Sequence, residues 1–172
     1  NFIEYLIYLG LGFVTWIYVS NSFIDAPELF QRNSSQIHNT NTDYIIYAME
    51  DWAFQYQNFI QSLILVIGVL SFIKFKVLIN FLTFGIVPLI NIILFSFWFP
   101  LLISLAGIRY KDFYQLIPIF NQLIFLLSPF LYEEKDLGSL NWISDLNPFY
   151  QIIAQFRDSI IIGKFDFKIS IS

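Results

Sequence analysis

Few residues in this chain could support acid–base chemistry, and they lie in short polar stretches between long uncharged ones. Two neighbouring carboxylates could act as general acid and base on a lipid-linked substrate. Close acidic or acid–base pairs occur at Asp25/Glu28, Glu50/Asp51, Glu133/Glu134 and Arg157/Asp158. All of them lie at the edges of uncharged windows, where solvated loop ends are the commoner reading. A membrane enzyme with Asp25 or Glu28 as its base remains an alternative.

The sequence has few residues that could bind a metal ion or act as a catalytic nucleophile. The sequence has no cysteine and one histidine, His38, so thiolate sites and multi-histidine metal centres are excluded. Neither a phosphate-binding GxxxxGK[ST] loop nor a GxSxG or HExxH motif occurs. We therefore expect no metal site and no cofactor on this chain.

The composition is typical of a protein that resides in a lipid bilayer. Hydrophobic residues make up 57% of the 172 residues, and charged residues make up only 13%, about half of the share in soluble domains. Mean hydropathy is +0.64. The net charge of −4 argues against nucleic acid as a partner. We predict an all-α integral membrane helical bundle.

Uncharged windows place the membrane spans. Windows without Asp, Glu, Lys or Arg cover 5–24, 52–73, 77–108 and 113–132, and a crossing needs roughly 20 apolar residues. These predict spans at about 3–23, 58–75, 80–107 and 113–131 in a single transmembrane domain, 1–172. The third window is too long for one straight crossing, so we expect Pro88 and Pro100 to bend or tilt it.

Two further amphipathic elements are expected outside the spans. Residues 43–57 could form an interfacial helix that leads into the second span. A helix at about 148–162 is well delimited, with Asn147 as N-cap, Pro148 in the first turn and Gly163 after the last. Its apolar residues share one face, away from which we place Arg157 and Asp158. It is too short to cross, which predicts an interfacial or re-entrant helix.

The order of features in the second half resembles the permease subunit of type-2 ATP-binding-cassette exporters, especially the branch that exports O-antigen, capsular polysaccharide and teichoic acid. The matching features are the patch Arg109–Asp112, then Ser128-Pro129, then Asn147-Pro148, and finally Phe156-Arg157-Asp158 with Gly163. Members of the family have six spans. The resemblance therefore implies an incomplete permease, with spans two to five plus the re-entrant helices, that belongs to a longer membrane protein.

The resemblance also implies partners and a location. We expect a homodimer in the cell inner (cytoplasmic) membrane, in contact with membrane lipid and with an ATP-binding-cassette ATPase that carries ATP and Mg. By position, the ATPase contact includes Ser35, Asn39, Asn41 and Asp43, and a cytoplasmic patch comprises Arg109, Lys111 and Asp112. The exported substrate is a glycan or glycolipid. Alternatives are a drug or lipid exporter of the same type and the membrane enzyme above.

A long glycan that slides through a pore needs many weak, similar contacts, and aromatic rings provide them by stacking on sugar faces. The residues expected to line the substrate path and outer gate are Phe120, Phe125, Phe130, Tyr132, Phe149, Tyr150, Arg157 and Asp158. Basic residues favour the opposite orientation to the family topology, because more of them lie on the expected outer side.

Overall fold

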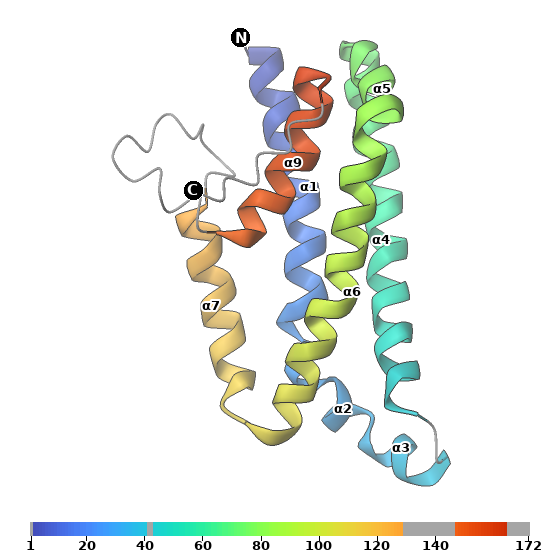
Figure 1. The fold of residues 1–172 in the computed structure, drawn as a ribbon, viewed down its shortest axis with the longest axis vertical. Coiled ribbons are helices and arrows are strands. Elements are labelled where there is room, and N and C mark those ends of the chain that lie inside the picture. Colours follow the sequence, from blue (N-terminus) through green and yellow to red (C-terminus); the bar gives the residue numbers. More distant parts are fainter. Residues whose placement is uncertain (1, 41–42, 129–146, 165–172) are drawn as a thin grey trace.

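A computed structural model describes residues 2–40, 43–128 and 147–164, and almost all of them are helical. Long helices run side by side along the molecule (Figure 1). They are α1 (Phe2–Ile24), α4 (Tyr44–Ile73) and α6 (Ile86–Arg109). Two shorter helices, α7 (Phe113–Leu127) and α9 (Pro148–Ile162), pack against α1 and α6. Short connecting helices are η1 (Ala26–Glu28), α2 (Leu29–Arg32), α3 (Ser34–Thr40), α5 (Lys76–Asn80) and the π-helical η2 (Phe81–Gly85).

Three helical stretches are long and apolar enough to cross a membrane: Phe2–Arg32, Tyr44–Ile73 and Lys76–Arg109. This confirms the predicted all-α membrane bundle. The fourth predicted span, 113–131, is described only as far as Ser128, and its helix α7 has 15 residues, which rise about 22 Å. The described part of that helix is thus shorter than a full crossing of roughly 30 Å.

The second long helix begins earlier than the sequence predicts. Instead of an interfacial helix at 43–57 followed by a span at 58–75, α4 is one unbroken helix of 30 residues. Its first half packs within the bundle: the Trp52 ring meets Phe97 edge-on at 5.5 Å, and Trp52 Nε1 donates to the Ile93 carbonyl at 3.3 Å. Packing against α6 keeps this half in line with the rest.

The third window is continuous helix from α5 through η2 to α6, and its irregular turn lies before the prolines. The π turn of η2 spans Phe81–Gly85, whereas Pro88 is in the first turn of α6 and Pro100 is inside it. The wide turn is the place where α9 packs: the Phe81 ring meets Phe156 edge-on at 6.4 Å. Sequence periodicity carries no signal for such a turn.

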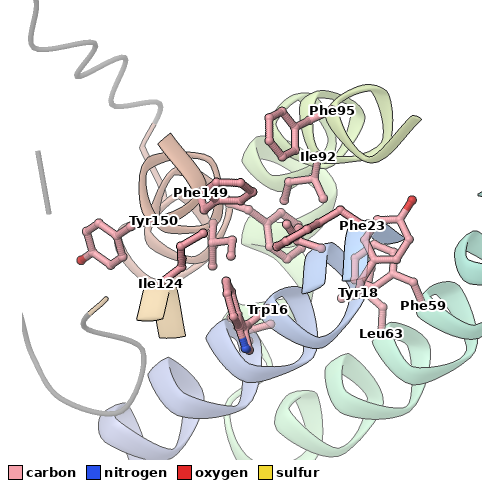
Figure 2. Close-up of a cluster of buried hydrophobic side chains, with 14 of the residues drawn as sticks. Trp16, Tyr18, Phe23, Phe59, Leu63, Ile92, Phe95, Ile124, Phe149 and Tyr150 are labelled. Atoms are coloured by element: carbon pink, nitrogen blue, oxygen red, sulfur yellow. The ribbon is translucent and has the colours of Figure 1, made fainter. Parts of the chain in front are cut away.

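The core of the bundle surrounds α1, which packs against α4, α6, α7 and α9. Figure 2 shows its aromatic centre, where Tyr18 stacks on Phe59 with ring centroids 4.1 Å apart. Nearby, Phe149 of α9 packs against Phe23, 5.2 Å away, and Phe95, 5.6 Å away. Many large apolar side chains on the outer surface are exposed, among them Phe72 at 95%, as a lipid-facing surface requires.

Candidate functional site

The helix α9 lies against the upper half of the bundle in Figure 1, packed on α1, η2 and α6. Its bounds, Pro148–Ile162, agree with the predicted helix at 148–162. Asn147 is the N-cap, and its Oδ1 accepts from the backbone N–H groups of Phe149 (3.1 Å) and Tyr150 (3.3 Å). Asn147 Nδ2 also donates to Ser128 Oγ, 2.6 Å away. This cap therefore ties the start of α9 to the end of α7.

The other end of α9 is held by a side chain from a different helix. Gly163 ends the helix in the left-handed region, with φ 71°, where glycine has no Cβ penalty. Buried Asn80, the last residue of α5, donates from Nδ2 to the carbonyl of Ile160 at 2.7 Å. This bond satisfies a helix-end carbonyl that has no partner within the helix. Both ends of α9 are thus capped by asparagines, one local and one distant.

Arg157 is buried, contrary to the prediction that it lies off the packed face of its helix. Its side chain is 2% exposed, and its guanidinium carbon lies 3.8 Å from the centroid of the Tyr8 ring on α1. Its Nε donates to Asp158 Oδ1 at 2.8 Å, and Nη2 donates to the Tyr150 hydroxyl at 3.3 Å. The flat guanidinium can pack inside the bundle because a ring face covers it and a carboxylate balances its charge.

The hydrogen-bond donors of Arg157 are only partly matched within the described residues. An arginine side chain keeps its proton in proteins, so the buried group stays cationic. Its Nη1 is buried and has no hydrogen-bond partner among the residues that the structure describes. The Asp158 side chain is 40% exposed and links the buried cation to the surface. Their hydrogen bond joins opposite charges and is therefore charge-assisted.

The predicted path aromatics do not share one surface. Phe149 and Tyr150 are buried at the start of α9, and Phe125 stacks on Trp16 at 5.7 Å. Phe120 is 48% exposed on α7, away from that core. Phe130 and Tyr132 lie outside the described residues. A role of these rings in a substrate path therefore stays a prediction.

The opposite end of the bundle carries the segment predicted to contact an ATPase. Ser35 and Asn39 are exposed on α3, and exposed Asp43 precedes α4, whereas Asn41 lies outside the described residues. The exposed patch Arg109, Lys111 and Asp112 forms the turn from α6 to α7 at the same end.

A cavity of 220 Å³ lies between this turn and the α2–α3 segment. Phe30, His38, Tyr44 and Lys111 are among the side chains that line it. At the same end, an ion pair between Arg32 and Asp51, 3.2 Å apart, connects α2 to α4. The chain segment between α1 and α4 is thus folded against the bundle and offers a mixed apolar and basic surface.

No metal centre is formed within the described residues, which contain no group of three or more His, Cys, Asp or Glu side chains close enough to hold an ion. Asp25, which precedes η1, and Glu28, its last residue, are both exposed. The pair Glu133/Glu134 lies outside the described part of the chain.

Sequence reasoning missed three residues that position these elements: Asn80, Tyr8 and Gly107. At Gly107, an added Cβ would lie 2.7 Å from the Cα of Pro27, so only glycine lets α6 approach η1 this closely. A polar Asn80 inside a long apolar window was a visible signal for a buried hydrogen bond. Neither Tyr8 nor Gly107 differs in pattern from its neighbours.

Comparison with known proteins adds one match. A family model described as ABC-2 type transporter matches residues 4–161, which includes all of α1 after its first two residues and α9 almost to its end. A search of curated proteins gave no match.

Proposed function

The chain belongs to the ABC-2 type transporter family, and from that premise we propose that it exports a polysaccharide or a lipid-linked glycan of the O-antigen, capsule or teichoic acid type. The family membership makes it the membrane component of an ABC exporter, a transport subunit that is not itself catalytic. We also propose that two copies of the chain work together and that they lie in the inner (cytoplasmic) membrane.

We propose that the work of transport is divided between this chain and an ATPase. ATP and Mg belong to a separate ATPase, and the permease converts its movement into opening of a path. We propose that α3 and the turn Arg109–Asp112 contact that ATPase, since both lie exposed at one end of the bundle. The cavity lined by His38 and Lys111 lies between these two contacts, so a push on α3 would reach both α1 and α6.

The observation that carries the glycan proposal is the placement of α9. A short helix is held at the depth of the long helices by Asn147 and Asn80, with aromatic Phe149 and Tyr150 in its first turn. Aromatic faces bind polymer units by stacking with little dependence on the exact unit. Because Phe149 and Tyr150 are buried, we propose that they hold this helix at the outer gate, while exposed rings such as Phe120 stack on the glycan.

We further propose that two copies form the path. One face of α7 exposes Leu116, Ile119, Phe120 and Leu123, and a second α7 facing it would enclose a channel with these side chains on its walls. In this arrangement Phe120 contacts substrate from the wall, while Phe149 and Tyr150 support the outer gate from inside each copy.

The direct test is genetic and chemical. The gene should lie beside a reading frame for an ATP-binding-cassette protein, and its deletion should remove the surface polysaccharide while lipid-linked glycan accumulates inside the cell. Accumulation of a drug or a simple lipid instead would favour the drug or lipid exporter of the same family. Loss of the glycan without any accumulation inside would favour a synthetic enzyme.

A further inference from the structure

A long apolar groove runs between α4 on one side and α5, η2 and α6 on the other. Its volume is 520 Å³, and apart from Ser71 its lining side chains are apolar. Along α4 the lining extends from Ile60 to Phe72, a rise of about 18 Å. One leaflet of a hydrocarbon core about 30 Å thick measures roughly 15 Å, so the groove is one leaflet long.

The groove is open to its surroundings rather than closed inside the bundle. Ile64, Phe72 and Phe75 line it, and their exposed fractions are 67%, 95% and 66%. Gly68 leaves additional room, since a Cβ placed there would meet no atom within 4 Å. In a bilayer such a groove does not stay empty, because its lining would lose dispersion contacts on one side.

Positive charge lies at one end of the groove. Phe75, in the turn between α4 and α5, lines the groove, and the flanking Lys74 and Lys76 line a separate small pocket of 50 Å³ beside α1 and α9, together with Glu4. Lys74 pairs with Glu4 at 3.6 Å, in an exposed contact. No ion pair to Lys76 occurs within the described residues, and the groove lining contains no carboxylate. The two lysines and Glu4 therefore leave one net positive charge beside this end of the groove.

We propose that the groove binds an acyl chain of an anionic phospholipid, whose headgroup lies against Lys74 and Lys76. An acyl chain matches the length and the apolar lining, and basic residues at a membrane surface attract anionic headgroups. This site is distinct from α9 and independent of the exported substrate.

The test measures which lipids stay bound to the full-length permease. The protein is placed in nanodiscs of equal phosphatidylglycerol and phosphatidylcholine, extracted in mild detergent, and its retained lipids are counted by mass spectrometry. We expect about tenfold enrichment of phosphatidylglycerol, since each lysine near the surface contributes about 1 kcal/mol and Glu4 offsets part of that sum. The double variant Lys74→Gln/Lys76→Gln should reduce the enrichment to about one, and Lys111→Gln, the same charge change at the other end, should leave it unchanged.

A second pair of variants tests the acyl chain. Gly68→Leu places a side chain in the groove and should reduce the total retained lipid, whereas Val69→Leu, which places the same side chain at an exposed position outside the groove, should not. Equal retention of both lipids by the unmodified protein would overturn the proposal without any variant. Unchanged retention in Gly68→Leu would also overturn it, as would a disulfide between two copies that carry Ile64→Cys, which would assign the groove to a second copy. None of these measurements uses the ATPase or an export assay, so they stand apart from the proposed function.

Discussion

The guanidinium carbon of Arg157 lies 3.8 Å from the centroid of the Tyr8 ring, and this contact joins α9 to α1. The ring covers one face of a cation that is otherwise enclosed by the bundle, while Asp158 accepts from its edge at 2.8 Å. A buried cation without these partners is costly. The position of α9 therefore depends on a residue from the start of the chain.

Arg157→Ala should impair export while the permease still reaches the membrane at normal levels. The substitution leaves Asp158 and the Tyr8 ring without their common partner, and α9 loses a contact of about 2 kcal/mol. Export of the glycan and the amount of permease in washed membranes are measured together. The control is Lys164→Ala, which removes a charge just after the same helix. Normal export in Arg157→Ala would show that the contact between Arg157 and Tyr8 is not needed for export.

Two substitutions of Tyr8 distinguish the contribution of its ring from that of its hydroxyl in the same contact. Tyr8→Phe keeps the aromatic face and should retain most export, whereas Tyr8→Leu removes it and should resemble Arg157→Ala. A double-mutant cycle of Tyr8→Leu with Arg157→Ala should give a coupling of about 1–2 kcal/mol in thermal stability. Additive effects of the two substitutions would contradict a direct interaction.

Asn80→Ala should lower the stability of the permease by about 1–3 kcal/mol, because the buried carbonyl of Ile160 loses its donor. The midpoint of thermal unfolding in detergent measures the change. Asn91→Ala, at an exposed position of α6, removes the same side chain without that bond and should have little effect. Equal midpoints for the two variants would show that the end of α9 does not need Asn80.

Gly107→Ala should be destabilising by about 1–3 kcal/mol, because the added methyl group overlaps the backbone of Pro27. Either α6 or η1 must move, and η1 leads directly into α2 and α3. Gly68→Ala is a matched control with open space around its Cβ. Thermal midpoints are compared, and a Gly107→Ala protein as stable as Gly68→Ala would mean that η1 shifts at no cost.

The absence of cysteine from the 172 residues makes the chain suitable for site-directed cross-linking. Single variants Ser35→Cys and Asn39→Cys on α3 should cross-link to the ATPase, and Phe75→Cys at the opposite end should react only with reagents outside the cell. Basic residues lie at both ends of the bundle, so their distribution does not set the orientation in the membrane, and this experiment determines it. Cross-links to the ATPase from Phe75→Cys alone would invert the topology.

Tyr132→Leu combined with Tyr150→Leu should lower export of long glycan chains without loss of ATPase binding, if both rings belong to the substrate path. From the sequence these two stand out among the aromatics, because tyrosine hydroxyls gain little from facing lipid. In the structure Tyr150 is buried and its hydroxyl accepts from Arg157 Nη2 at 3.3 Å, so its replacement acts on export through the position of α9. Chain length of the surface glycan and co-purification of the ATPase are measured on the same cells. Unchanged long chains would exclude an aromatic path at this place.

The features that could be predicted from the amino-acid sequence depend on local chain chemistry and on transfer into lipid. Uncharged windows predicted α1 and the continuous α5–α6 region closely, because each charge at membrane depth is expensive wherever it lies. Asn147, Pro148 and Gly163 predicted both ends of α9, because caps act within a few residues of the helix.

Features that need a partner far along the chain could not be predicted and became visible only in the packing of the helices. Arg157 is buried because Tyr8 covers it, α4 stays straight because Trp52 packs on α6, and Gly107 is required because Pro27 approaches it. Periodicity places a residue on a face of its own helix but does not say which other helix meets that face. A charge on an amphipathic helix therefore reads as solvated until the ring that encloses it is known.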